Sequence, residues 1–425
     1  MKRLLLTLCL LLSIANLFAE RVNYTLGCGW QFSRDESKWE SVTVPHDWAI
    51  YGPFDKEVDK QTVRIMQNNE KRATEKYGRT GSLPHIGVGW YRLEFELPTF
   101  DDTKEAIILF EGAMSHAEVS VNGERVGGRG YGYSYFYFDI TQYLKVGESN
   151  LLEVRLENPA QSSRWYPGAG LYRNVSITVK ERVSIEQWGV NITTPQITEQ
   201  EARINIKCKI KNSDKAKNIS IETDILDADN NVVASDRSDN LICGEFIQNI
   251  KLSDPMLWSP ESPNLYFARN RVYADGVLKD EVTTRFGVRE IDYSAEHGFR
   301  LNGEVRKFKG VCLHHDLGAL GTAVNVAALR RQLTILKDMG CNAIRSSHNM
   351  PSLEQLDLCD EMGFMFLAES FDEWAVPKVK NGYSHLFEEW AEADIVTWSA
   401  PHATTPRSLC GAQATKSPTN TAAQG

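Results

Sequence analysis

Polar and titratable side chains follow three short apolar segments in the last third of the sequence. The segments span residues 307–315, 341–347 and 364–370. If they are neighbouring parallel strands, the side chains at their carboxyl ends meet at one edge of the sheet, where ligands bind. The candidate ligand-binding residues are Arg345, His348, His314, His315, Asp316 and Glu369. Imidazole, guanidinium and carboxylate groups of this kind could form hydrogen bonds with a polar ligand.

The run His314, His315 and Asp316 also invites interpretation as a metal site. Its spacing lacks the usual ligand geometry, so we expect no metal there. Because the two histidines are adjacent at a strand end, at most one of them is expected to face the ligand.

Two carboxylate arrangements have structural explanations. Arg345 and Glu369 could form an ion pair inside the protein instead of contacting ligand, and both interpretations stay open. Asp372 and Glu373 are neighbours in sequence. Since such neighbours rarely face one substrate, we expect a solvated loop there.

The elements between these segments read as helices. Asn325 can cap a helix that Gly340 ends, and its apolar stripe is Leu329, Leu333, Leu336 and Met339. Ser352 can cap a second helix through Met362. Strand, helix, strand, helix, strand with short links indicates a parallel α/β unit. A barrel and a doubly wound sheet both fit.

The preceding sequence is rich in β-strand signals. Trp90–Leu97 and Leu151–Leu156 alternate apolar and polar residues. Val119–Gly127 reads as a hairpin around an Asn-Gly turn. The aromatic run Tyr131–Phe138 is expected to alternate into the core of this domain. A further stretch of about 100 residues, with about seven short strands, has the size of an immunoglobulin-like sandwich.

Composition excludes several classes of protein. The net charge of −9 argues against a nucleic-acid partner. Lys2 and Arg3 precede a short apolar stretch, and Ala19 ends a plausible cleavage site, which predicts a signal peptide and a secreted or periplasmic protein. No later segment predicts a membrane span. The eight cysteines are scattered singly, so we expect free thiols.

Ordered motifs then point to one family. They are VPHDW (44–48), GVGWYRLEF (87–95), RWYPGAGLYRNV (164–175), TRFGVREI (284–291), FKGVCLHHDLGALG (308–321) and RSSHNMP (345–351). Together they resemble the β-galactosidase branch of glycoside hydrolase family 2. The resemblance implies a multidomain fold: a jelly-roll sugar-binding-like domain, an immunoglobulin-like β-sandwich and a (β/α)₈ TIM barrel. The expected parts are a signal peptide at 1–19, the jelly roll at 20–180, the sandwich at 181–286, the first part of the barrel at 287–396 and a disordered tail at 397–425.

The resemblance also implies a retaining exo-glycosidase that acts on β-linked sugars without a cofactor or catalytic metal. β-Glucuronidase or β-mannosidase specificity, or a non-catalytic carbohydrate-binding fragment, are the alternatives. The residues implied to bind sugar hydroxyls are those at the strand ends. Trp165 and Tyr166 could stack on a sugar ring or pack between domains. The expected partner is an oligosaccharide or β-glycoside; the sequence predicts no oligomeric state.

The two glutamates that perform the family's reaction are not found. The acid/base closes an Asn-Glu pair on the fourth barrel strand, and the nucleophile lies on the seventh. No Asn-Glu pair follows residue 370 in this sequence. We therefore assign no catalytic residue and expect an incomplete barrel and an inactive chain.

The tail from Thr397 suggests the cause. Read one base earlier, the codons of residues 403–406 admit Arg-Asn-His-Pro, and those of 410–416 admit Leu-Trp-Ser-Thr-Gly-Asn-Glu. The second peptide would be the family's fourth strand with its acid/base. We infer a frameshift near Val396, from a gene lesion or a sequencing error.

Resequencing the gene across the codons of residues 390–425 tests this hypothesis. We expect a one-base discrepancy, or a lesion at this point relative to intact homologous genes. If the DNA encodes TWSAPHATTP in frame with no such difference, the frameshift hypothesis is wrong.

Overall fold

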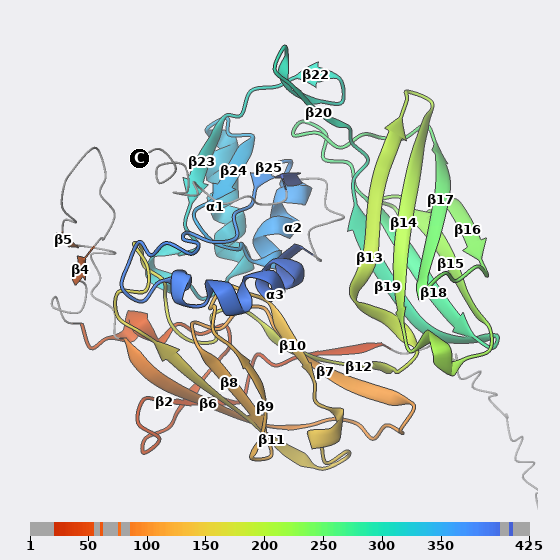
Figure 1. The fold of residues 1–425 in the computed structure, drawn as a ribbon. Coiled ribbons are helices and arrows are strands. Elements are labelled where there is room, and N and C mark those ends of the chain that lie inside the picture. The colour runs from red at the N-terminus through yellow and green to blue at the C-terminus, as the bar shows by residue number, and fades with distance from the viewer. Residues whose placement is uncertain (1–20, 55–59, 63–74, 78–85, 400–407, 411–425) are drawn as a thin grey trace, which may run out of the picture.

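The computed structural model describes residues 21–54, 60–62, 75–77, 86–399 and 408–410. The predicted signal peptide lies outside the described residues, and so does most of the predicted tail. Figure 1 shows a β domain below, a β-sandwich to one side and a mixed α/β part above the first domain. Among the described residues no helix is long and apolar enough to cross a membrane. Six cysteines are free thiols: Cys28, Cys208, Cys243, Cys312, Cys341 and Cys359.

The first domain is a jelly roll of two antiparallel sheets packed face to face. One sheet contains β1 (Val22–Thr25), β12 (Val175–Glu181), β7 (Lys104–Phe110) and β10 (Phe136–Asp139), in that order. The other contains β3 (Glu40–Val42), β2 (Trp30–Ser33), β6 (Gly87–Glu96), β11 (Ser149–Asn158), β8 (Ala117–Val121) and β9 (Glu124–Arg129). β4 (Lys60–Thr62) and β5 (Glu75–Tyr77) form a separate pair.

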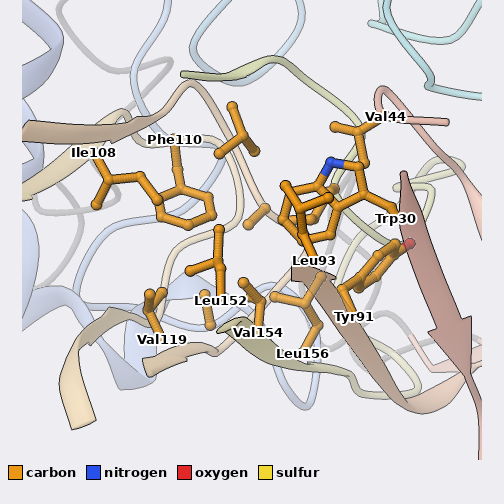
Figure 2. Packing of buried hydrophobic residues seen from close by; sticks show 14 of the residues in the cluster. Trp30, Val44, Tyr91, Leu93, Ile108, Phe110, Val119, Leu152, Val154 and Leu156 are labelled. Atoms are coloured by element: carbon orange, nitrogen blue, oxygen red, sulfur yellow. The ribbon is translucent and has the colours of Figure 1, made fainter. Parts of the chain in front are cut away.

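The core of the jelly roll follows from the alternation of its strands. Every second residue of β11 is buried, including Leu152, Val154 and Leu156. They meet Phe110 of the opposite sheet and Trp30 of β2 in one apolar cluster (Figure 2). The predicted hairpin at Val119–Gly127 is confirmed, since Asn122 and Gly123 at its turn have φ angles of 53° and 81°.

The second part is a β-sandwich of seven strands, as the sequence predicts. Its smaller sheet contains β13 (Ser184–Ile197), β14 (Glu201–Lys211) and β17 (Glu245–Ser253). Its larger sheet contains β16 (Val232–Ser238), β15 (Ile219–Leu226), β18 (Tyr266–Ala274) and β19 (Val277–Phe286). Isoleucines from both sheets fill the space between them.

The third part begins with a small antiparallel sheet and continues as a parallel one. The small sheet contains β20 (Ile291–Ser294), β21 (Gly298–Leu301) and β22 (Glu304–Val305). The parallel sheet contains β23 (Gly310–Leu313), β24 (Ala343–Ser346), β25 (Met365–Leu367) and β26 (Ser408–Cys410). α1 (Val326–Asp338) and α2 (Leu353–Met362) connect the first three parallel strands, and α3 (Phe387–Ser399) follows β25. This βαβαβ order is the beginning of a TIM barrel.

Both predicted helix caps are present. The Asn325 side chain accepts a hydrogen bond from the Ala328 amide at 3.0 Å, and Ser352 accepts one from Gln355. The prediction that Met339 belongs to the buried apolar stripe of α1 is wrong, because Met339 is 70% exposed. α1 ends at Asp338, and Met339 occupies the C-cap.

The prediction of a disordered tail from Thr397 is wrong at its start. α3 extends to Ser399, since Trp398 is buried and Thr397 Oγ1 donates to the Ala393 carbonyl at 2.9 Å. Residues 408–410 then pair in parallel with β25 as β26. The rest of the predicted tail, 400–407 and 411–425, lies outside the described residues.

The prediction for the aromatic run Tyr131–Phe138 is also wrong for its tyrosines. Tyr131, Tyr133 and Tyr135 pack with the barrel residues, and only Phe136 belongs fully to the jelly-roll core. The Tyr131 hydroxyl donates to the Ser370 carbonyl at 2.9 Å. A run of aromatics can alternate between two cores when a second domain covers the outer face of the strand.

Asp47 connects the jelly roll to the barrel. Its side chain is 1% exposed and accepts hydrogen bonds from the amides of Ala49, Ala169 and Thr322 at 2.9–3.0 Å. It also accepts from the Thr322 hydroxyl and from the Tyr166 hydroxyl at 2.7 Å. Burial raises the pKa of Asp47 even though all these bonds favour the carboxylate.

We expect Asp47→Ala to lower the free energy of unfolding by about 3 kcal/mol, because several buried donors lose their acceptor. Urea unfolding of the chain measures this. Asp35→Ala is the control, since exposed Asp35 forms hydrogen bonds only with residues two or three positions away, at the end of β2 and in the loop after it. Equal effects of the two substitutions would contradict the role given to Asp47.

A second contact, between half-buried side chains, joins Glu111 of the jelly roll to Glu354 of α2. Burial, followed by the charge of Glu354, raises the pKa of Glu111 to about 9. Asn174 Nδ2 contacts carboxylate oxygens of both residues, and Arg173 is the nearby cation. The two carboxyl groups therefore share this site with a proton between them at neutral pH.

This pair predicts a pH dependence of stability. The unfolded chain releases the Glu111 proton near pH 4.5, whereas the folded chain holds it to about pH 9. The free energy of unfolding should fall as the pH rises through this window. Glu111→Gln should flatten that slope in urea unfolding at pH 5, 7 and 9, and exposed Glu148→Gln should not. An unchanged slope in Glu111→Gln would refute the shared proton.

Candidate functional site

The carboxyl ends of β23, β24 and β25 lie at one edge of the parallel sheet, because the three strands pair in parallel and in sequence order. Figure 1 shows this edge turned toward the jelly roll. The predicted candidates from the second and third segments, Arg345, His348 and Glu369, are brought together here.

Glu369 is the centre of the cluster. Its side chain is 3% exposed and forms an ion pair with Arg345 Nε. Its second carboxylate oxygen lies 3.1 Å from His348 Nδ1. The Glu369 amide donates to Ser346 Oγ at 2.9 Å, which fixes the backbone at this point. The structural ion pair left open by the sequence is therefore present.

The ion pair does not remove Arg345 from the site. Its guanidinium also donates to Cys312 Sγ at 3.3 Å, and its side chain remains 27% exposed. Cys312 lies on β23, and Glu369 lies two residues after the end of β25. Arg345 therefore spans the strand edge and holds Glu369 in place.

The contacts of His348 determine its tautomer. A carboxylate only accepts hydrogen bonds, so the contact with Glu369 requires a proton on Nδ1. Arg345 Nη2 lies 3.3 Å from the same nitrogen. Because a protonated Nδ1 cannot accept a hydrogen bond, Arg345 acts on the His348 ring only through its charge. In this tautomer Nε2 is the ring atom that can accept a hydrogen bond from a ligand hydroxyl.

Trp165 reaches this cluster from the jelly roll. Its indole stacks on the His314 ring with centroids 5.1 Å apart and planes 13° apart, and it lies edge-on to His348 at 5.6 Å. Its Nε1 donates to the Tyr133 hydroxyl at 3.1 Å. Trp165 thus packs between domains and forms one wall of the site. The Tyr166 hydroxyl, by contrast, donates a hydrogen bond to Asp47.

The two adjacent histidines point to different places. His314 Nδ1 donates to the Ser347 carbonyl at 2.5 Å, and burial lowers the pKa of His314. His315 turns under the jelly roll: its Nε2 donates to the Pro167 carbonyl at 3.0 Å, and its ring lies edge-on to Tyr133. Burial lowers the pKa of His315 to about 3. His315 is therefore a neutral interface residue.

Asp316 is half-buried. Its negative charge partly offsets the lowering of the His314 pKa by burial. No group of three or more possible metal ligands occurs among the described residues. The run 314–316 thus divides between the cluster, the domain interface and the loop that follows.

The predicted solvated loop at Asp372 and Glu373 is wrong, because both side chains are buried. Asp372 pairs with Arg164 and with Lys378 at 3.2 Å. Burial would raise the pKa of Asp372, but the hydrogen bond and charge of Arg164 outweigh it, so the pKa is lowered. Glu373 accepts from the amides of Val379 and Ser384 at 3.3 and 3.1 Å. Both carboxylates are therefore engaged by partners within the protein.

Two residues of this region were missed by sequence reasoning. Arg164 holds Asp372 from 208 residues away, a pairing that no local pattern signals. Asn349 is 2% exposed, and its Nδ2 lacks a hydrogen-bond partner within the described part of the chain. Its place directly after His348 was the only available signal.

Comparison with known families gives the identity of this fold. The profile described as "Glycosyl hydrolases family 2, sugar binding domain" matches residues 28–180, and "Glycosyl hydrolases family 2" matches 183–289. "Glycosyl hydrolases family 2, TIM barrel domain" matches 295–398. The three domains occur in order over nearly all the described residues. The chain belongs to glycoside hydrolase family 2.

Two curated proteins are similar to this chain over most of its length. "Beta-galactosidase BoGH2A" of Bacteroides ovatus is 39% identical over 381 residues, which are 88% of this chain and 43% of that protein. A "Putative beta-glucuronidase" of Formosa agariphila is 35% identical over 92% of this chain and 37% of that protein. The chain thus spans about two fifths of the length of these relatives.

A solved structure gives the same result. The crystal structure of a family 2 member from Bacteroides cellulosilyticus matches with a TM-score of 0.83 and 30% sequence identity, over 91% of this chain and 50% of that one. The predicted fold class, with jelly roll, immunoglobulin-like sandwich and partial TIM barrel, is confirmed for this family 2 chain.

Proposed function

We propose that this chain is part of a secreted or periplasmic, β-galactosidase-like enzyme that removes β-linked sugars with retention of configuration. The observation that carries the proposal is the cluster of Arg345, Glu369 and His348 at the strand edge, walled by Trp165 from the jelly roll. Fixed polar groups beside an indole suit a sugar, which has hydroxyls and apolar faces. A relative that carries the name β-galactosidase supports this choice.

The charges favour a neutral sugar over a uronic acid. The two arginines at this edge, Arg345 and Arg164, are each paired with a carboxylate, Glu369 and Asp372. A sugar carboxylate would have to compete with these partners. β-Glucuronidase and β-mannosidase specificity are therefore the alternatives to test, and we expect no nucleic-acid partner.

The cluster of Arg345, Glu369 and His348 would bind and orient a sugar, but hydrolysis of the glycosidic bond needs two opposed carboxyl groups. Glu369 is held by Arg345 and His348, and no Asn-Glu pair follows β25 in the sequence. We propose that the 425-residue chain is inactive by itself. The parallel position of β26 beside β25 is where the corrected reading frame would supply the fourth strand.

The test is to express both the 425-residue chain and the longer product of the corrected frame, and to assay aryl β-galactoside, β-glucuronide and β-mannoside. We expect the longer product to cleave the β-galactoside with a β-anomeric product by NMR, and the shorter chain to cleave none.

In the longer product, Arg345→Ala should lower kcat/KM by about 100-fold, because it frees Glu369 and His348 from their productive positions. Arg203→Ala, which removes a surface ion pair with Glu201, is the matched control and should leave kcat/KM unchanged. Turnover of none of the three glycosides by the longer product, or turnover by the short chain, would overturn the proposal.

A further inference from the structure

A second groove lies where the jelly roll, the sandwich and α2 meet. Its volume is about 700 Å³. Its lining residues include Ser176 of β12, Gln187 and Trp188 of β13, Thr283 of β19 and Asp357 of α2. None of its lining residues belongs to the cluster around Glu369. Figure 1 shows the lower end of β13 beside β10 and β12 at this junction.

Trp188 has an unusual backbone. The pairing of β13 with β14 shifts register between Ile185 and Val190, and within this bulge Trp188 has a φ of 55°. A bulky residue rarely adopts this left-handed conformation. Such conformations persist where the surrounding structure imposes them, and they concentrate at ligand-binding positions.

The bulge places the indole in an aromatic group at the groove. The Trp188 ring lies 6.0 Å from Tyr135 and 5.6 Å from Tyr137, measured between ring centroids. Tyr135 is buried and its hydroxyl donates to the Pro351 carbonyl, which anchors the group. Tyr137 is 41% exposed and Trp188 is half-buried. Of these three rings, Trp188 lines the groove, and its packing against Tyr135 and Tyr137 holds the indole there.

Hydroxyl and amide groups line the groove beside charged side chains, which include the exposed carboxylates of Glu186 and Glu281. Hydroxyls come from Ser176, Thr178, Thr283 and Thr284, and an amide from Gln187. The arginines that line the groove are already neutralised: Arg21 pairs with Asp280 at 2.6 Å and Arg285 pairs with Asp357. A phosphate or another anion would gain little here. A ligand with apolar faces and many hydroxyls matches both walls.

We propose that this groove is a second carbohydrate-binding site, for an oligosaccharide of β-linked neutral hexoses. The choice of β-linked hexose rests on the proposed function, whereas the groove and its chemistry do not. The site would hold a chain of sugars across the junction of the three domains, separate from the strand edge where Glu369 lies.

Isothermal titration calorimetry of the 425-residue chain with β-1,4-galactotetraose tests this proposal. We expect millimolar binding that Trp188→Gly weakens by about tenfold, because the aromatic platform is lost. Glycine adopts the φ of residue 188 without strain, so this variant should keep its fold. Thr283→Val, which removes an exposed hydroxyl at nearly constant shape, should weaken binding by about fivefold.

Two matched variants locate the binding. Trp39→Ala removes a half-buried indole on another face of the jelly roll, against Arg92, and Arg345→Ala alters the strand-edge cluster. Both should leave the groove affinity unchanged. If Trp188→Gly and Thr283→Val bind like the parent chain, or if no binding is measured, the groove proposal is wrong. Loss of binding only in Arg345→Ala would leave the proposed function standing and refute the second site.

Discussion

The candidate site depends on the docking of the jelly roll against the carboxyl edge of the parallel strands. Arg173, fully buried, donates to the carbonyls of Glu111 and Tyr133 in its own domain and to that of Met350 beyond β24, the last at 2.6 Å. Together with Asp47 and Thr322, it ties the first domain to the loops after β23 and β24. A buried cation held by three fixed carbonyls tolerates little displacement. These bonds set where Trp165 meets His314 and His348.

Burial then sorts neighbouring residues into different roles. His314 and His315 are consecutive, yet one stacks beneath Trp165 and the other is enclosed by tyrosines. Arg345 and Arg164 are each neutralised by a buried carboxylate. The result is a site with little net charge but several oriented hydrogen-bonding groups. Such a site discriminates by the number and direction of hydroxyls more than by ligand charge.

Local signals predicted much of the fold. The Asn-Gly turn, the caps at Asn325 and Ser352, and the alternation of β11 each specify their element through contacts a few residues apart. Their outcome does not depend on the rest of the chain. The expectation that side chains at the carboxyl ends of parallel strands meet at one edge also placed Arg345, His348 and Glu369 together, without knowledge of their contacts.

The errors arose where distant parts of the chain cover a residue. Tyr131, Asp372 and Glu373 resemble core or loop residues of their own segments, but a second domain or a returning loop buries them. The prediction for Met339 failed for a different reason, since α1 ends one residue before it and its side chain is exposed. His315 shows the limit of motif reasoning, because its role is set by Pro167, 148 residues earlier.

The position of Trp165 has an evolutionary consequence. An indole encoded in the first domain packs against His314 and His348, which are encoded after residue 310. Recombination between homologous genes at the junctions of the domains would therefore separate residues that must match in shape. Exchanges that preserve activity should carry both sides of this contact together, so the ancestry of the jelly roll and of the barrel should coincide within the family.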